Sequence, residues 1–190
     1  MDSESGCTFA NGNLDASTNG GRVAVASFGV PMSGKWYWEG AFLGGTGTDG
    51  WIGAIPTTNR SDGSGRYYRT NGQQLSGGSW TSYGASYGQN DVIGVALDQD
   101  NNTVTFYKNG TSQGAQTSVP LRERVAACNN DGSAGWAFNF GQRPFAYTAP
   151  SGFKALCTAN LPAPSVTKPS TVMDVLLWTG NGSTQTISGL

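Results

Sequence analysis

The sequence predicts an all-β protein, built as an antiparallel sandwich of two sheets. Glycine contributes 29 of the 190 residues, and aromatic residues are numerous, with 6 Trp, 7 Tyr and 8 Phe. Many glycines among many aromatic residues are typical of short strands joined by tight turns. Strand-like segments recur at short intervals with turn residues between them, and this spacing without helices favours a sandwich.

The clearest strand signals form a pair in the middle of the chain. Residues 91–98 and 103–108 flank the polar turn 99–102, which predicts a β-hairpin, and Asn109-Gly110 turns the chain again. Both faces of 91–98 are apolar or small, so this strand needs cover on both sides. Further strands are expected at 22–27, 35–42, 51–56, 125–128 and 136–140. The tryptophans inside these segments, Trp36, Trp38, Trp51 and Trp136, are predicted to pack in the core.

A domain boundary is predicted after residue 160. Residues 161–171 hold three of the eight prolines and favour an extended linker. Residues 1–160 are therefore expected to form the sandwich, and 172–190 a C-terminal β segment with strand signals at 173–179 and 184–187. That segment is too small to bury its own face. It is either an extension packed on the sandwich or the start of a further domain.

Composition excludes several classes of function. Charged residues make up 12% of the chain, the net charge is −1, and no basic stripe is visible, so nucleic-acid binding is not expected. No apolar run approaches the roughly 20 residues of a membrane span, so no membrane insertion is expected. The three cysteines are odd in number and widely spaced, which fits neither a disulfide framework nor a zinc site.

No catalytic constellation stands out either. Histidine is absent, which removes the commonest general base and the commonest metal ligand. Glu39 and Asp91 are acidic residues at strand positions, but sequence spacing does not pair them. Residues 98–102 resemble the start of a calcium loop but lack its later glycine and glutamate, because Thr103 and Asn109 stand there. We therefore predict no catalytic residue, no metal site, no cofactor and no enzymatic activity.

Four segments resemble motifs of the SPRY (B30.2-like) domain. They are SGKWYWE at 33–39, WIGA at 51–54, the hairpin motif over 91–110, and FNFGQRPF at 138–145. The ordered set covers roughly residues 6–160. The resemblance implies a bent antiparallel β-sandwich of the concanavalin-like jelly-roll type that acts as a binding module.

The stretch from 66 to 87 is the strongest candidate for a binding surface. It holds four tyrosines, one tryptophan and two arginines, residue types that dominate binding hot spots and also suit stacking on sugars. The resemblance places this stretch on the variable ligand face, although aromatic residues beside a sandwich core usually serve in packing. The predicted ligand-binding residues are Arg66, Tyr68, Arg69, Asn71, Trp80, Tyr83, Tyr87, Asn129 and Asn130.

The ligand itself does not follow from the resemblance. Some peptide-binding members carry a V-W-G contact near the position of Asn129 and Asn130, and this chain lacks it. A glycan binder should show an exposed aromatic platform with nearby polar groups. A docking module should show an apolar patch or an unpaired edge strand, and a peptide binder a preformed pocket.

A finer resemblance concerns the kind of protein. Segments 152–162, 173–175 and 178–182 are similar to tail or virion proteins of tailed bacteriophages, where a SPRY-like domain precedes another β-rich domain. This implies a structural or host-attachment module in the phage particle, with other virion proteins or a host-surface protein or glycan as partners. The full-length protein is then expected to form a homo-oligomer such as a trimer. Two alternatives stay open: a carbohydrate-binding receptor-recognition module, and a cytoplasmic SPRY domain that binds cellular proteins.

Overall fold

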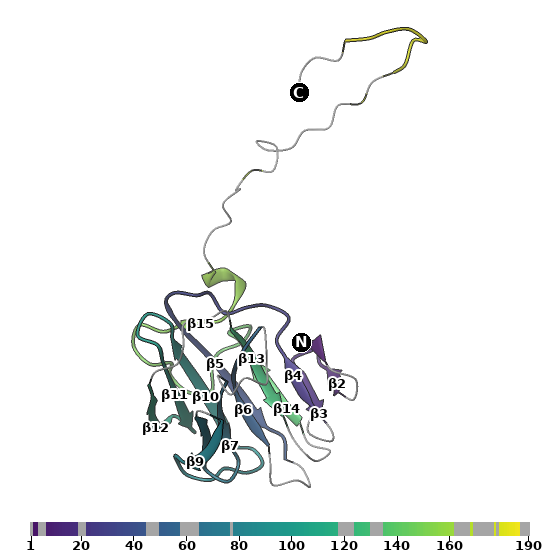
Figure 1. The fold of residues 1–190 in the computed structure, drawn as a ribbon. Helices are drawn as coiled ribbons and strands as arrows, with labels where there is room; N and C mark the ends of the chain where they lie inside the picture. The colour runs from purple at the N-terminus through teal and green to yellow at the C-terminus, as the bar shows by residue number, and fades with distance from the viewer. Residues whose placement is uncertain are drawn as a thin grey trace. The chain divides into compact units, whose positions relative to one another are not determined.

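The chain divides into two compact units, Met1–Asn160 and Leu161–Leu190. The computed structural model describes residues 2–3, 7–18, 22–44, 50–57, 65–76, 78–117, 124–129, 135–161, 168, 177 and 179–186. In the first unit the described residues form two antiparallel sheets, which confirms the predicted all-β sandwich (Figure 1). No helix in this part of the chain is long and apolar enough to cross a bilayer.

Sheet A contains seven strands in the order β1-β4-β13-β6-β7-β8-β9. Its strands are β1 Asp2–Ser3, β4 Val23–Val25, β13 Arg124–Asn129, β6 Trp51–Pro56, β7 Arg66–Arg69, β8 Gln73–Ser76 and β9 Ser79–Ser82. Sheet B contains eight strands in the order β12-β11-β10-β5-β14-β3-β2, and β15 pairs with β5 off this path. Its strands are β12 Thr111–Gln116, β11 Thr103–Lys108, β10 Val92–Asp98, β5 Lys35–Phe42, β14 Gly135–Asn139, β3 Asp15–Thr18, β2 Cys7–Ala10 and β15 Lys154–Ala155.

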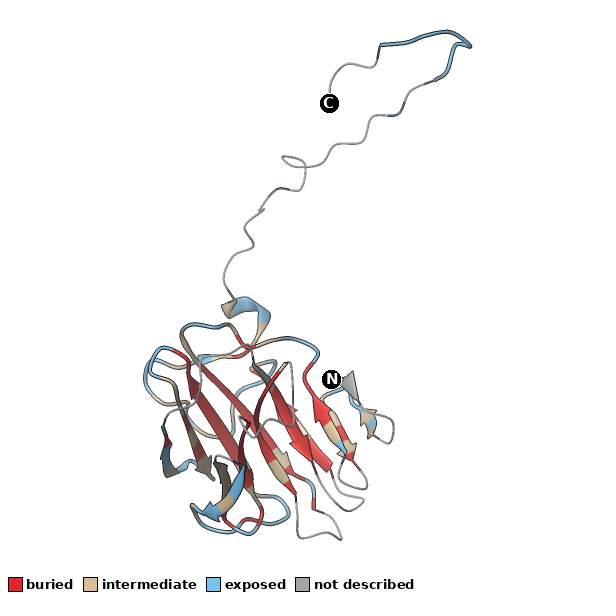
Figure 2. Cartoon of the chain, in the orientation of Figure 1, coloured by how far each residue is buried: buried red, intermediate tan, exposed pale blue. Residues whose placement is uncertain are grey.

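Strand β10 lies at the centre of sheet B, between β5 and β11. Val95 pairs with Trp38 on one side and with Phe106 on the other, and the β10–β11 pair is antiparallel as predicted. Ile93, Val95 and Leu97 are fully buried on the face toward sheet A. Figure 2 shows that buried residues concentrate on these central strands, whereas β9 at the edge carries exposed ones. Sheet A covers one face of β10, as the sequence predicted, and a segment outside the two sheets covers the other face.

The outer face of β5 and β10 is covered by residues 140–157, a segment that we call the strap. The ring of Phe145 packs edge-on against Tyr37, with ring centroids 4.9 Å apart. Glu39, which is only 3% exposed, accepts hydrogen bonds from the backbone N–H groups of Ala146 and Tyr147 and from the Tyr37 hydroxyl. The strap ends as β15, which pairs in parallel with β5. A buried carboxylate therefore fastens the strap to the sheet.

Glycine is required on β10 beneath the strap, where the Tyr37 ring lies against the backbone of Gly94. A Cβ atom at Gly94 would stand 2.3 Å from the Tyr37 hydroxyl oxygen, so the glycine of the hairpin motif makes room for the ring beneath the strap. At the turn after β11, Asn109 and Gly110 both adopt positive φ, 47° and 78°. The predicted turn at this dipeptide is confirmed, since Asn and Gly tolerate left-handed backbone best.

The other strand predictions have mixed outcomes. The expected strands at 35–42, 51–56 and 103–108 match β5, β6 and β11 residue for residue. Trp36, Trp38 and Trp136 are core residues, as predicted, whereas Trp51 is only half-buried. Strands β2, β3, β8, β9 and β12 were not among the predicted strands.

The second unit is described only in part. Residues 179–186 are exposed and form no strand, so the strand predicted at 184–187 is wrong for its described residues, 184–186. Most of the strand predicted over 173–179 lies outside the described residues. Within that range Leu177 is 93% exposed.

Candidate binding surface

The region singled out from the sequence, residues 66–87, contains the strands β7, β8 and β9 of sheet A, and β7 pairs with β6. Neighbouring side chains of β7 point to opposite faces, as in any strand. Tyr68 pairs with Ile52 on the inner face of the sheet, and Tyr67 pairs with Gly53 on the outer face. This alternation decides which of the predicted residues reach solvent.

A row of aromatic rings lies on the outer face of sheet A. The ring centroids of Trp51 and Tyr67 are 4.2 Å apart, and those of Tyr67 and Trp80 are 6.2 Å apart. The guanidinium of Arg69 lies over the Trp80 ring, 4.7 Å from its centroid. We call Trp51, Tyr67, Trp80 and Arg69 the aromatic row.

The aromatic row stands on a buried apolar base. Tyr67 belongs to a buried cluster with Val25, Ile55 and Ala127. Trp51, Trp80 and Leu75 pack against this cluster and are half-buried. Trp80 also lies on β9, the last strand of sheet A, which pairs with β8 on one side. A half-exposed tryptophan with an arginine over its face is thus held on a rigid support.

Tyr68 and Tyr87 do not lie on this surface, so their prediction as ligand contacts is corrected. Tyr68 is fully buried and Tyr87 is 6% exposed. Their rings contact each other at 4.9 Å, and Tyr68 also contacts Phe106 across the sandwich at 5.6 Å. The Tyr68 hydroxyl donates to the carbonyl of Ala85, and the Tyr87 hydroxyl donates to the carbonyl of Tyr68 at 2.7 Å. Both phenols therefore serve the core.

Arg66 and Asn129 are likewise buried. Arg66 is 7% exposed, and its Nη1 donates to the carbonyl of Gly65 at 3.0 Å. Burial lowers the pKa of this guanidinium. Asn129 is 5% exposed, and its Nδ2 donates to the carbonyl of Arg22 at 2.7 Å. The prediction of these two as ligand contacts is also corrected, and Asn130 lies outside the described residues.

Asn71 and Tyr83 reach the surface but already serve the structure. The Asn71 side chain accepts a hydrogen bond from the backbone N–H of Gln73 and donates to its side chain, which closes a turn. The Tyr83 hydroxyl donates to the carbonyl of Gly114 and accepts from the backbone N–H of Phe106 at 3.2 Å. Of the nine predicted residues, Arg69 and Trp80 are the two that the structure brings together, half-buried, on the outer face of sheet A.

The buried phenols give the fold a defined alkaline limit. Burial raises the pKa of Tyr68 and Tyr87 well above 10, and it raises that of Tyr83 to about 12. In the unfolded chain, tyrosine hydroxyls have a pKa of about 10. Their contribution to stability is thus complete below about pH 10 and is lost as the pH rises toward 12. We expect the Tm to be level between about pH 8 and 9.5 and to fall steeply above about pH 10. In a Tyr87→Phe variant, which lacks one of these phenols, the fall should be less steep. A Tm that stays level up to about pH 12 would contradict this expectation.

Two residues on the outer face of sheet A, Trp51 and Leu75, were not among the predicted ligand-binding residues. Trp51 starts the strand β6 and was predicted to be a core residue, but its position in the register places it on the outer face beside Arg69. Leu75 pairs with both Tyr67 and Trp80 in neighbouring strands. The signal is the alternation of side chains along β6 for Trp51 and along β8 for Leu75, and it assigns a face only once one inward-facing residue of the sheet is known.

The acidic residues make structural contacts. Glu39 holds the strap, and Asp91 accepts from Asn109 and the backbone of Gly88 and forms an ion pair with Lys108 at 3.4 Å. The calcium-like segment is a hairpin turn in which Asp98 pairs with Lys35 at 3.1 Å. Among the residues that the structure describes, no group of three or more His, Cys, Asp or Glu side chains could hold a metal ion.

Comparisons with known proteins agree on the fold. The sequence profile of the SPRY domain matches residues 35–143, more than half of the chain. The SPRY domain of human HERC1 superposes with a TM-score of 0.63 at 22% identity, over 73% of this chain and 94% of that one. Another human SPRY domain superposes with a TM-score of 0.62 at 16% identity, over 76% of this chain and 100% of that one.

Two curated relatives are similar in sequence. The chain is 33% identical over 92 residues to the ATP-dependent RNA helicase Ddx1 of Drosophila melanogaster, over 47% of this chain and 13% of the helicase. It is 35% identical over 81 residues to the DDX1 helicase of Xenopus laevis, over 41% of this chain and 11% of that protein. The chain thus spans a small part of the length of either helicase. SPRY domains are generally non-enzymatic modules that bind other proteins, and by its sequence profile and its fold this chain belongs to the SPRY domain family.

Proposed function

We propose that this chain is a non-enzymatic module that binds a protein partner on the outer face of sheet A, through the aromatic row. The observation that carries the proposal is the half-buried Trp80 with the Arg69 guanidinium 4.7 Å from its ring centroid. Tryptophan and arginine are the residue types most often found as hot spots at protein interfaces. Here they sit on paired strands, so binding does not have to order them first.

The same geometry favours a protein over a glycan. A sugar binds a tryptophan by stacking on an open face of the ring, and the Arg69 guanidinium covers one face of Trp80. Tyr67 and Leu75 then back the pair with apolar surface. An arginine stacked on an aromatic ring places a positive charge beside an apolar patch, which suits a mixed apolar and acidic protein surface.

The proposal predicts that Trp80→Ala weakens binding at least tenfold, because an aromatic hot spot is worth about 1.5–3 kcal/mol. Arg69→Ala should weaken it by a similar factor. The probe is a random-peptide display library selected on the immobilised wild-type chain, followed by isothermal titration of an enriched peptide against each variant. Circular dichroism should show an unchanged fold in both variants.

Two exposed residues away from the aromatic row supply the controls. Phe28→Ala and Lys154→Ala remove an exposed aromatic and an exposed basic side chain, respectively, and should leave binding unchanged. Enriched peptides that bind Trp80→Ala as tightly as the wild type would refute the proposed surface. Binding to a glycan array that is lost in Trp80→Ala would instead support the carbohydrate-binding alternative.

We further propose that the module works in a tailed-phage virion, where it docks on another virion protein or on a host-surface protein. The resemblance of segments 152–162, 173–175 and 178–182 to phage virion proteins supports this, as does a charged fraction of only 12%. The competing proposal is a cytoplasmic SPRY domain that binds a cellular protein, which the similarity to the two helicases favours.

A protein inventory by mass spectrometry separates the two locations. The virion proposal predicts peptides of this chain in purified phage particles, at a level comparable to those of other tail proteins. Recovery of the chain from the cytoplasmic fraction alone, with none in the particles, would favour the cellular alternative. Native mass spectrometry of the full-length protein then tests for a trimer.

A further inference from the structure

The outer face of sheet B has a partly exposed strip beside the strap, where Val92, Ala41, Ala137 and Asp15 are half-buried and Ala10 is exposed. One register row crosses five strands there, because Val92 pairs with Ala41, Ala41 with Ala137, Ala137 with Asp15, and Asp15 with Ala10. Except for Val92 and Asp15, these residues are alanines. Small side chains in one row leave a low floor across the sheet.

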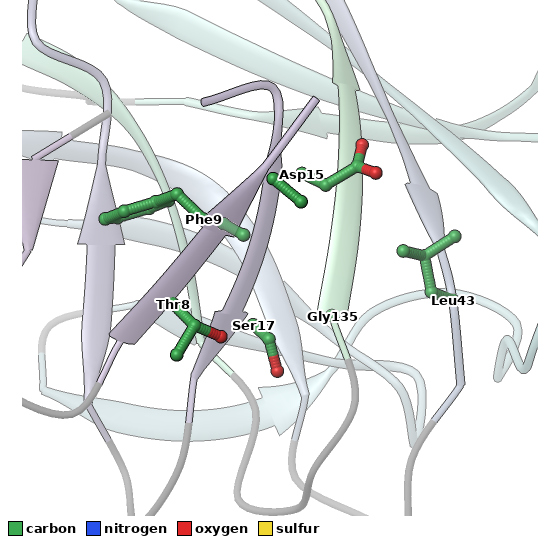
Figure 3. A pocket seen from close by; sticks show the side chains of 8 residues that line it. Thr8, Phe9, Asp15, Ser17, Leu43 and Gly135 are labelled. Carbon is green, nitrogen blue, oxygen red and sulfur yellow. The ribbon is translucent and has the colours of Figure 1, made fainter. Parts of the chain in front are cut away.

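Two pockets open on this floor. The first has a volume of about 310 Å³, and its lining includes Ala10, Asp15, Ser17 and Leu43. Figure 3 shows the Asp15 carboxylate and the Leu43 side chain on one side of this pocket and the hydroxyls of Thr8 and Ser17 on another. Leu43 is 44% exposed, an unusual exposure for a large apolar side chain.

The second pocket, of about 120 Å³, adjoins the first across the Ala137–Asp15 pair. Its floor includes Ala41 and Ala137, and the strap residues Arg143 and Pro144 form its wall. Arg143 is exposed and makes no ion pair or hydrogen bond with any residue that the structure describes. The two pockets therefore share one alanine floor, with a carboxylate toward β3 and a guanidinium at the strap.

We propose that these pockets are two halves of one groove, which binds an extended segment of a protein partner carrying a basic and an acidic side chain. The basic side chain pairs with Asp15, and the acidic one pairs with Arg143. An apolar side chain between them lies on the alanine floor. This groove is on the opposite sheet from the aromatic row, so it is a second interaction surface.

The spacing of the charges sets the length of the segment. Ala41 and Val92, which line the second pocket with Arg143, lie two and three strands from Asp15, a span of about 10–14 Å. An extended chain advances about 3.3 Å per residue, so side chains four positions apart span about 13 Å and point to the same face. Among the described lining residues of the two pockets, Phe9 at the β2 edge is the one aromatic side chain, and the floor residues Ala10, Ala41 and Ala137 give a sugar no ring to stack on. A peptide with a basic–apolar–acidic pattern at alternate positions therefore fits the groove best.

The test uses a capped peptide, Lys-Thr-Val-Thr-Glu, titrated into the ¹⁵N-labelled full chain while amide resonances are followed by NMR. We expect the largest shifts at Ala10, Asp15, Ala41 and Ala137. The neutral peptide Gln-Thr-Val-Thr-Gln should bind about fivefold more weakly for each ion pair lost, the most that a solvent-exposed pair usually contributes. Asp15→Asn and Arg143→Gln should each lose about fivefold for the charged peptide.

Matched variants separate this groove from the rest of the surface. Ala10→Trp fills the groove at an exposed strand position and should abolish the shifts, whereas Arg22→Gln should not change them. Trp80→Ala should also leave them unchanged, so this result is independent of the proposed function. Equal binding of both peptides, shifts confined to β7–β9, or the same groove shifts produced by neutral oligosaccharides alone would each overturn the proposal.

Discussion

Replacing Phe106 by alanine is expected to lower the free energy of unfolding by about 3–5 kcal/mol, the usual range for a buried phenylalanine. Phe106 is fully buried on β11 and pairs with Val95 of β10. Its ring contacts Tyr68 of the opposite sheet at 5.6 Å and Tyr83 at 6.0 Å. The substitution leaves a cavity where the two sheets meet, which neighbouring side chains fill only in part. Chemical denaturation followed by tryptophan fluorescence measures the change.

Phe28→Ala is the matched control for this prediction. Phe28 is 37% exposed and contacts Phe140 at 5.3 Å, so its loss should cost at most about 1 kcal/mol. A cost below about 1 kcal/mol for Phe106→Ala as well would mean that Phe106 is not the central core aromatic, and the alignment of the hairpin motif would fail.

Glu39→Gln is expected to cost about 2–4 kcal/mol, because hydrogen bonds to a charged group are strong and a buried unmatched donor is costly. The Glu39 carboxylate accepts from the backbone N–H groups of Ala146 and Tyr147 at 2.8 and 3.0 Å. Glutamine has only one acceptor oxygen, so its NH₂ group would face one of these two donors. The strap should therefore loosen before the rest of the sandwich does.

Hydrogen exchange resolves this local effect. The amides of Ala146 and Tyr147 should exchange faster in Glu39→Gln, while those of β10 and β11 keep their protection at low denaturant. Asp100→Asn is the control, since Asp100 is exposed and accepts a single backbone hydrogen bond, from Gly34. Unchanged exchange at 146 and 147 would show that the carboxylate does not hold the strap.

The sequence predicted the parts of the fold whose pattern is strong. A strand with apolar residues on both faces, such as Val92–Asp98, can only be central. The Asn109-Gly110 dipeptide predicts the turn after β11, because both residues tolerate left-handed backbone. The edge strands lack such a signal. Thr111–Gln116 reads TSQGAQ, with no apolar alternation, and forms a strand because β11 supplies its pairing partners. The strand conformation of this segment therefore depends on its pairing with β11 and not on the local β propensity of its residues.

The candidate surface was predicted as a region but not residue by residue. Composition alone drew attention to the aromatic and arginine-rich stretch, yet Tyr68 faces inward and Arg69 outward because they are neighbours in one strand. A shift of the register by one residue would exchange their roles. The groove on sheet B gave no sequence signal, because it depends on alanines from strands far apart in the chain.

Photo-crosslinking tests the central claim most directly, namely that recognition uses the outer face of sheet A. A library-selected peptide carrying a benzophenone group is bound to the wild-type chain and irradiated, and mass spectrometry identifies the crosslinked residues. If the partner binds the outer face of sheet A, crosslinks are expected on β7, β8 and β9, around Arg69, Leu75 and Trp80. Crosslinks confined to β10–β12 or to the strap would contradict it.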